Sequence, residues 1–230
     1  MRYLTTIILI IFSATFSYAQ TYEAGLLLGG SNFIGDVGAT NYIAPNKPAF
    51  GALFKWNLSS RHSFRFSIMY TELEGKDSKS DDPRRVERDY SFTNQIIEGS
   101  LGIEFTFFEW DLHDEKIHAT PYLYSGIAVA YHDNFYFSRL GVLTSEDTSS
   151  FAYGIPIVFG FKTNVIGNII IAAEVGARYT FSDELDGSVP DAESRQEALS
   201  FGNINNNDWY MFTGITLTYT FGNKPCFCVF

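Results

Sequence analysis

Apolar and polar side chains alternate strictly through residues 168–182. One face of this stretch runs in apolar residues from Ile169 to Phe181, whereas the opposite face carries Glu174 and Arg178. A repeat of two residues indicates a β-strand, and about ten residues of tilted strand cross a bilayer. One face of the strand is apolar and ends in aromatic residues, and the opposite face carries charges. This arrangement is typical of a membrane barrel strand, which has lipid on one side and a polar interior on the other.

Seven more stretches show the same alternation, and together they predict the fold class. The predicted strands cover residues 22–31, 49–58, 63–73, 92–107, 120–131, 153–162, 168–182 and 209–221. We expect an all-β chain folded as an eight-stranded antiparallel transmembrane β-barrel of the outer-membrane type. Beyond the N-terminal region no apolar run reaches 18 residues, so the sequence predicts no helical membrane span.

The connections between the predicted strands alternate in length. The long ones cover residues 32–48, 75–89, 132–150 and 183–207, and the shorter ones cover residues 59–62, 108–119 and 163–167. Outer-membrane barrels have long extracellular loops and short periplasmic turns. The alternation therefore predicts a location in the cell outer membrane with both termini in the periplasm. The polar connections 75–89 and 183–207 are expected to be solvated loops.

The N-terminus has the organisation of an export signal. Arg2 supplies a positive charge, residues 4–12 form a short apolar core, and Ser17 and Ala19 form a small-residue cleavage site. We expect a cleaved signal peptide at residues 1–19, the barrel at residues 20–221 and a periplasmic tail at residues 222–230.

Composition agrees with a membrane barrel and disfavours one class of function. The chain contains 22 Phe and 14 Tyr, which two aromatic girdles would use. Its formal net charge of −10 disfavours nucleic-acid binding, because that function needs basic patches to neutralise phosphate.

Several charged residues fall on the predicted inner face. An eight-stranded barrel has an interior just wide enough for side chains, so we expect these charges to pair in a structural network and not to line a pore. They are Lys55, Arg65, Glu98, Glu104, Lys162, Glu174 and Arg178.

The sequence offers little catalytic chemistry. His132 is the one histidine expected near the outer rim, with Asp133 and Ser138 nearby, but no spacing forces these three together. The acidic and histidine-containing turn 108–119 lacks a fixed metal-ligand spacing. We therefore expect no catalytic residue, cofactor or metal site.

The short turn 108–119 and the C-terminal tail are the expected docking surface for a periplasmic partner, with Trp110 as an exposed aromatic anchor. Cys226 and Cys228 are either unpaired or joined to another molecule, because a disulfide across one residue would be strained. The candidate partner-binding residues are Glu109, Trp110, Asp111, His113, Asp114, Lys224, Cys226 and Cys228.

Distinctive segments lie at residues 31–38 (SNFIGDVG), 42–51 (YIAPNKPAFG), 55–57 (KWN), 61–65 (RHSFR), 73–83 (LEGKDSKSDDP), 100–108 (SLGIEFTFF), 120–127 (TPYLYSGI) and 222–226 (GNKPC). Together they resemble the PorG family, outer-membrane barrels of the type IX secretion system. That system exports proteins across the outer membrane and is linked in some bacteria to gliding motility.

The resemblance implies an anchoring or assembly role beside outer-membrane lipid, with a periplasmic ring of PorK- and PorN-like proteins as partner. It brings no catalytic residues. The alternative functions are a small lipid-modifying outer-membrane enzyme and an adhesin-like barrel that acts through its extracellular loops.

Overall fold

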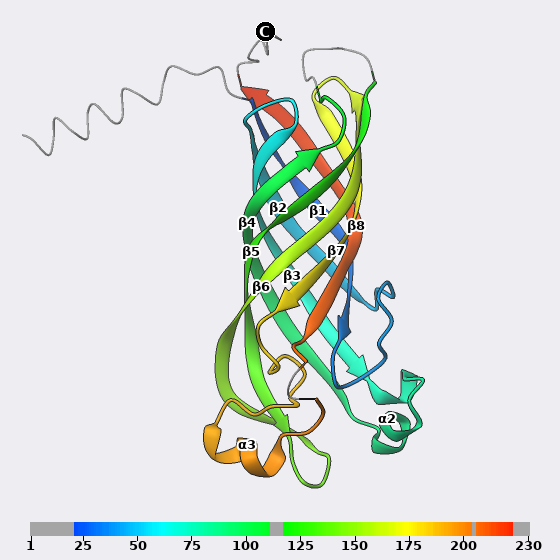
Figure 1. The fold of residues 1–230 in the computed structure, drawn as a ribbon, viewed down its shortest axis with the longest axis vertical. Helices are drawn as coiled ribbons and strands as arrows, with labels where there is room; N and C mark the ends of the chain where they lie inside the picture. The colour runs from blue at the N-terminus through cyan, green and yellow to red at the C-terminus, as the bar shows by residue number, and fades with distance from the viewer. Residues whose placement is uncertain (1–20, 111–116, 204–205, 223–230) are drawn as a thin grey trace, which may run out of the picture.

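The computed structural model describes residues 21–110, 117–203 and 206–222. Eight antiparallel strands follow one another around a closed barrel, and β1 pairs with both β2 and β8 (Figure 1). The strands are β1 (Thr21–Ile34), β2 (Lys47–Asn57), β3 (His62–Lys76), β4 (Ser91–Thr106), β5 (Ala119–Phe137), β6 (Leu143–Ile166), β7 (Ile169–Thr180) and β8 (Trp209–Gly222). The predicted fold class is confirmed, whereas the expected signal peptide and residues 223–230 of the expected tail lie outside the described residues.

The two ends of the barrel differ in construction. At one end, the terminal end, β1 begins, β8 ends and short connections join β2 to β3 and β6 to β7 (Figure 1). The opposite end, the loop end, carries the short helices and the longer loops. Within the described ranges, no helix is long and apolar enough to cross a membrane.

The connection from β3 to β4 is folded and anchored, not simply a solvated loop as its polarity suggested. It contains a 3₁₀ turn, η1 (Asp77–Lys79), and helix α2 (Pro83–Arg88). The Asp82 side chain accepts a hydrogen bond from the backbone of Arg84, so the sequence Asp-Pro supplies an N-cap followed by a proline in the first turn. Asp77 is fully buried and forms a 2.7 Å ion pair with Arg88.

The prediction that residues 132–150 form a loop is wrong for most of these residues. Strands β5 and β6 continue beyond their neighbours as a hairpin whose tip is residues 138–142. The polar sequence there suggested a loop, but Phe135 and Phe137 still alternate inward and pack in the core cluster. A bulge between Asp133 and Phe135 shifts the register where the hairpin leaves the barrel.

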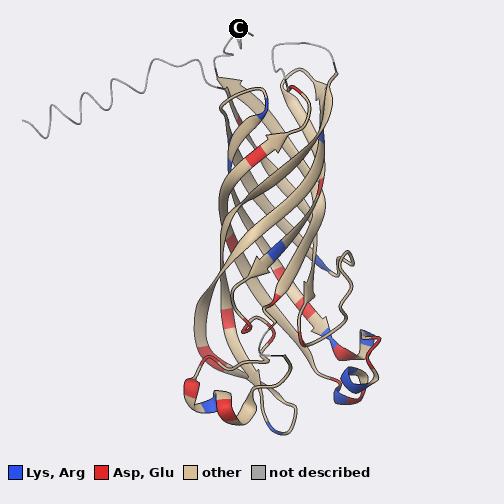
Figure 2. Cartoon of the chain, in the orientation of Figure 1, with Lys and Arg blue, Asp and Glu red and all other residues tan. Residues whose placement is uncertain are grey.

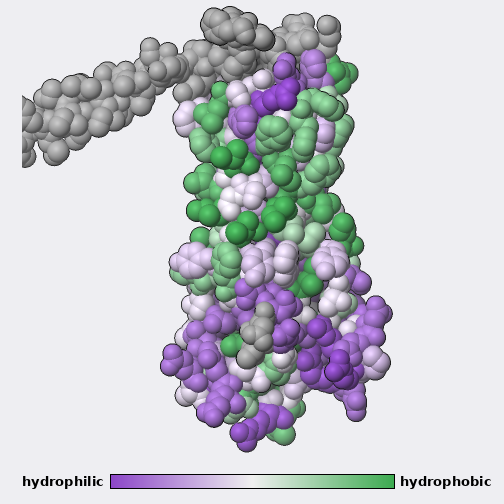
Figure 3. Space-filling model, in the orientation of Figure 1, coloured by the Kyte–Doolittle hydropathy of each residue, from purple (hydrophilic) through white to green (hydrophobic). Residues whose placement is uncertain are grey.

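The outer wall of the barrel is apolar. Outward positions on every strand expose large apolar side chains, and they form a green belt in Figure 3 above the hydrophilic loop end. Members of the belt include Leu26, Leu28, Phe50, Phe66, Ile68, Ile97, Leu101, Ile103, Ile127, Ile157, Phe159, Phe161, Ile215 and Leu217. Exposed apolar patches on water-soluble proteins rarely exceed a few hundred Å², so a belt around the whole barrel identifies a wall that faces lipid.

Aromatic pairs mark both borders of this belt. Near the terminal end, the Trp56 and Phe64 rings lie 5.9 Å apart. Near the loop end, Tyr179 and Trp209 lie 4.8 Å apart. Both are cross-strand pairs, and they lie at the two levels where the aromatic composition predicted girdles.

Candidate functional site

The lumen is filled by the side chains that alternate with the lipid-facing ones, and its charged members form a connected network. Glu104 of β4 is fully buried and pairs with one lysine from β2 and one from β6. Lys55 Nζ lies 2.7 Å from one carboxylate oxygen of Glu104, and Lys162 Nζ lies 2.9 Å from the other. Removing either partner from such a buried group would leave an uncompensated charge in the barrel.

A second part of the network is the bidentate pair of Arg65 and Glu174. The two guanidinium nitrogens of Arg65 lie 2.9 and 3.0 Å from the two Glu174 oxygens. Tyr122 donates a 2.7 Å hydrogen bond to the same carboxylate, and the Tyr124 ring centre lies 4.8 Å from the guanidinium carbon of Arg65. This geometry fixes the two charges, which come from β3 and β7, against each other across the lumen.

A third part pairs Arg178 with Glu98. The Arg178 Nε lies 3.2 Å from a Glu98 oxygen, and Tyr210 donates a 2.6 Å hydrogen bond to that oxygen. All seven interior charges that the sequence predicted are therefore inside the barrel and paired, so this prediction is confirmed.

Sequence reasoning missed an eighth member, Glu23. It is fully buried, lies 3.8 Å from Lys55 Nζ and accepts a 3.1 Å hydrogen bond from Asn57. Its place two residues before Gly25 on the inward face of β1 was the available signal. With Glu23 included, four carboxylates balance four cations. The carboxylates are Glu23, Glu98, Glu104 and Glu174, and the cations are Lys55, Arg65, Lys162 and Arg178.

Trp110 corrects one expectation for the terminal end. The sequence suggested an exposed aromatic, but Trp110 is only 5% exposed and its backbone N–H donates to Ser60. The Lys162 ammonium lies 5.0 Å from the centre of its ring. The ring packs against the charge network because a cation over an indole face is favourable in a site away from water. Trp110 therefore belongs to the barrel filling and not to an exposed docking surface.

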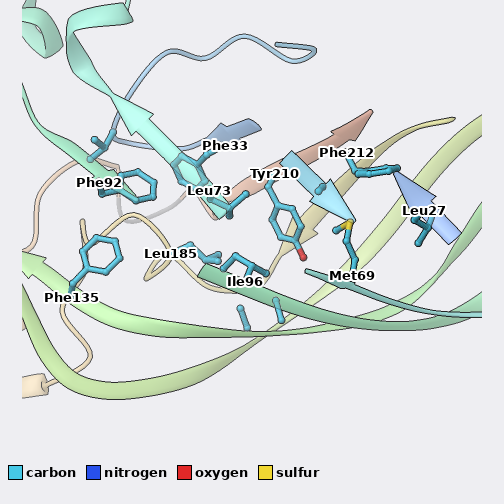
Figure 4. Close-up of a cluster of buried hydrophobic side chains, with 14 of the residues drawn as sticks. Leu27, Phe33, Met69, Leu73, Phe92, Ile96, Phe135, Leu185, Tyr210 and Phe212 are labelled. Carbon is cyan, nitrogen blue, oxygen red and sulfur yellow. The ribbon is translucent and has the colours of Figure 1, made fainter. Parts of the chain in front are cut away.

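A cluster of buried apolar side chains lies in the lumen towards the loop end, among buried polar residues such as Asn94 and His132. Figure 4 shows side chains from β1, β3, β4, β5 and β8 pointing into one shared space, where they meet Leu185 from the β7–β8 connection. Leu185, Leu73 and Ile96 are fully buried there. We call this cluster the plug; its larger members are Leu27, Phe33, Met69, Leu73, Phe92, Ile96, Phe135, Leu185, Tyr210 and Phe212.

Acidic side chains in the connection 183–207, which was expected to be solvated, and at the adjoining Asp208 are buried beside the plug. Asp186 and Asp208 are both fully buried. Burial raises the pKa of Asp183 to about 7, and repulsion from Asp186 and Asp36 adds to the effect. Burial also raises the pKa of Asp208 well above its ordinary value, with repulsion from Asp186 and Asp183 as the next causes. The expectation that residues 183–207 are simply solvated is therefore wrong.

Other charged residues lie on the surface of the loop end, where Lys and Arg gather on α2 and acids lie on and near helix α3 (Glu193–Leu199) (Figure 2). Arg195 of α3 forms a 3.0 Å ion pair with Glu146 of β6, which ties the β7–β8 connection to the projecting hairpin. The fold of α3 gave no strong sequence signal, because its N-cap position is Ala192 and makes no side-chain capping bond.

The candidate catalytic group around His132 is not assembled. His132 is 1% exposed within β5, and Asp133 accepts a 2.9 Å hydrogen bond from Ser149. Ser138 lies at the hairpin tip, six residues further along an extended chain and hence about 20 Å away. Its hydroxyl accepts a hydrogen bond from the backbone of Val142.

The candidate partner-binding residues fall into three groups. Glu109 has a side chain 68% exposed at the terminal end, where it lies 3.4 Å from Arg61. Trp110 is buried, as described above. The remaining candidates lie outside the described residues, and they are Asp111, His113, Asp114, Lys224, Cys226 and Cys228. Within the part of the chain that the structure describes, no three His, Cys, Asp or Glu side chains form a group that could hold a metal ion.

A family profile described as Domain of unknown function (DUF6089) matches residues 1–230, the whole chain. The chain belongs to the DUF6089 family. No curated protein matches this DUF6089 sequence significantly.

Solved structures similar to this DUF6089 protein are outer-membrane and surface proteins of low sequence identity. The Neisserial surface protein A (NspA) has 10% identity and a TM-score of 0.46, with 89% of this chain and 98% of that chain covered. The Yersinia pestis attachment invasion locus protein Ail has 12% identity and a TM-score of 0.44, with 89% and 100% covered. A major outer membrane protein from Thermus thermophilus has 11% identity and a TM-score of 0.45, with 89% and 100% covered.

The closed ring of strands, the lipid-facing belt and the aromatic girdles make this DUF6089 protein an outer-membrane barrel. Its lumen is occupied by protein side chains, from Trp110 at the terminal end through the charge network to the plug.

Proposed function

We propose that this DUF6089 protein is a structural component of the type IX secretion system. In this role it holds a periplasmic ring of PorK- and PorN-like proteins at the outer membrane, and it carries out no catalysis. The proposal joins the PorG resemblance of residues 31–38, 73–83 and 222–226 to the filled barrel. A link to gliding motility follows only where the secretion system itself drives gliding.

The observation that supports this function best is the filled lumen. Eight buried charges neutralise one another inside the barrel, and the plug fills the lumen towards the loop end. A barrel without a passage is suited to anchoring, because its rigid wall can fix a partner at one membrane face without conducting solutes.

In this proposal the terminal end faces the periplasm and binds the ring. Its exposed surface includes Glu109 and Arg61, with side chains 68% and 45% exposed, and Phe108, which is 61% exposed. The tail from residue 223 onward starts at this same end, because it follows the last residue of β8.

The test is recovery of ring proteins with the tagged barrel from crosslinked membranes. We expect the native protein to bring down a ring protein, and Glu109→Arg and a truncation before residue 223 to reduce that recovery. Glu193→Arg is the matched control, because Glu193 is an exposed acid on α3 at the opposite end. Folding of each variant is checked by heat-modifiable mobility on gels. Absence of any ring protein, together with normal secretion in a deletion strain, would refute the proposal.

A second candidate is an adhesin-like barrel that acts through the loop end. The observation in its favour is the projecting β5–β6 hairpin, whose tip exposes Leu140 by 90% and Val142 by 58%. Shortening this tip would abolish surface adhesion and leave protein secretion intact if this second function is correct. If the secretion role is correct, shortening the tip should leave secretion intact, and changes at the terminal end should impair it, because that role places the binding surface at the terminal end.

A further inference from the structure

Three chain segments meet beside the plug and are held together by aspartates. Asp186 accepts hydrogen bonds from the backbones of Asp36 and Val37, at 2.8 and 3.0 Å. Asp208, just before β8, accepts a 3.0 Å bond from the backbone of Leu185. Carboxyl groups thus join segment 182–188 to the chain that follows β1 and to the chain that precedes β8, the latter beside a backbone hydrogen bond from Asp208 to Ser182.

Several carboxyl oxygens in this cluster have no hydrogen-bond partner. Asp208 is fully buried, and its Oδ1 is unpartnered. That oxygen faces Gly35, since a Cβ added to Gly35 would lie only 2.4 Å from it. Both oxygens of Asp183 are also unpartnered. Burying an ionised oxygen without a partner is costly, whereas a protonated carboxyl carries no net charge.

The cations near this cluster are engaged elsewhere. Arg85 donates to the carbonyls of Gly35 and Gly38, and Arg88 donates to Asp77 and to the carbonyl of Asp36. Among the residues that the structure describes, no ion pair reaches the carboxyl groups of Asp183, Asp186 or Asp208.

The other titratable groups around the cluster are either acidic or already paired with residues outside it. Glu184 faces Asp191 and Glu146, and Arg195 pairs with Glu146. His132 has its own neighbours in Asp133 and Asp191. The cluster therefore has repulsion within it and no cation to offset that repulsion, which is the opposite of the arrangement in the lumen.

The cluster controls the position of one plug residue. Leu185 lies between Asp183 and Asp186 in the sequence, is fully buried in the plug, and accepts a 3.0 Å hydrogen bond from Asn94 on its carbonyl. Displacing segment 182–188 would withdraw Leu185 and uncover the loop end of the lumen.

We propose that these aspartates form a proton-operated latch, in which protonated carboxyls hold segment 182–188 and Leu185 in the plug and ionised carboxyls release them. The latch does not depend on the secretion role and would operate equally in an adhesin-like barrel.

The pH range of the latch follows from its carboxyl groups. The pKa of Asp183 is about 7, and burial raises the pKa of Asp186 above its ordinary value. The change therefore falls between mildly acidic and mildly alkaline conditions.

Hydrogen exchange of the full-length protein in lipid nanodiscs tests the latch. The reporters are the amides of Val37, Leu185 and Ser188, which donate to Asp186 and Asp208. We expect their protection factors, corrected for intrinsic exchange, to fall at least about tenfold between pH 5 and pH 8. The amide of Asp89, which donates to Arg85 in the neighbouring loop, should keep its protection.

Variants make the test specific. Asp208→Asn keeps an acceptor for Leu185 but removes the charge, so the fall in protection should shrink severalfold. Glu197→Gln, which changes an exposed acid on α3, should retain the native fall. Unchanged protection of the native reporters across this pH range would overturn the latch. So would full protection at pH 8 on adding calcium chloride, because that result would identify a metal ion and not a proton as the ligand.

Discussion

The lumen and the loop end both bury carboxylates, but they compensate them differently. In the lumen, Glu104 has ammonium groups within 2.9 Å on both oxygens, and Glu174 is bound bidentately by Arg65. At the loop end, Asp208 is equally buried and keeps one oxygen without a partner. The lumen is consequently a neutral, fixed scaffold, whereas the loop end retains a region whose stability depends on protons.

The same contrast exists within the loop end itself. Asp77 forms a 2.7 Å ion pair with Arg88 and accepts hydrogen bonds from the backbones of Gly38 and Tyr90. The β3–β4 connection is thus compensated, and the β7–β8 connection is not. The two connections both bury carboxyl groups, and they differ in whether a cation pairs with the buried group.

The largest expected effect comes from breaking the compensation in the lumen. Glu104→Gln would leave Lys55 and Lys162 as buried cations without their main partner, so we expect a loss of about 3–5 kcal/mol in the free energy of unfolding. Urea unfolding in lipid vesicles measures it. Adding Lys55→Met should cost less than the sum of the single changes. A loss below about 1 kcal/mol would show that the network contributes little.

Removing Leu185 from the plug has the next largest effect. Leu185→Ala should lower the free energy of unfolding by about 2–3 kcal/mol, because the side chain is fully buried. Leu140→Ala is the matched control at the 90% exposed hairpin tip, and it should change stability by less than about 0.5 kcal/mol. Equal effects at the two sites would contradict the assignment of Leu185 to the plug.

A smaller effect should appear at Asp183, with the opposite sign and a dependence on pH. Its pKa is about 7 in the folded protein against 3.8 for an ordinary Asp, so the folded state binds the proton more tightly. Folded-state stability therefore falls as pH rises from about 4 to about 7. Because Asp183 is only half-buried, we expect Asp183→Asn to stabilise the protein by about 1 kcal/mol at pH 8.

At pH 4 the same substitution should change the unfolding midpoint much less than at pH 8, since the carboxyl is protonated in the folded state and partly protonated in the unfolded chain. Urea midpoints at the two pH values provide the comparison. Equal stabilisation at pH 4 and pH 8 would mean that charge is not the cause.

The smallest stability effect is expected at the terminal end. Glu109→Ala removes an exposed 3.4 Å ion pair with Arg61 and should change the free energy of unfolding by less than about 0.5 kcal/mol. Recovery of the ring proteins should nevertheless fall if this surface binds them. Unchanged recovery would remove Glu109 from the docking surface.

The strand pattern allowed most of the barrel to be predicted from the sequence, because alternation specifies both the strand and the face of each residue. It also placed Lys55, Arg65 and Glu174 in the lumen. It could not show their partners, since ion pairing depends on the stagger between strands and not on the spacing within one strand.

The loop end was less predictable for physical reasons that particular residues illustrate. The polar stretch around Ser145 looked like a loop, but pairing with Phe135 of β5 makes it a strand. Asp186 lies in a connection that looked solvated, because nothing in its local sequence reveals that its carboxyl group accepts hydrogen bonds from Asp36 and Val37. At the other end, Trp110 was assigned to the surface because the contact of its ring with Lys162 is visible only in three dimensions.

The filled lumen is the central claim, and conductance across planar lipid bilayers tests it most directly. We predict no steady conductance at pH 5, where the latch is closed. We predict none at pH 8 either, because Trp110 and the paired charges around Glu104 still occupy the barrel when segment 182–188 is released. A stable, ohmic channel at either pH would contradict a sealed barrel and the anchoring function inferred from it.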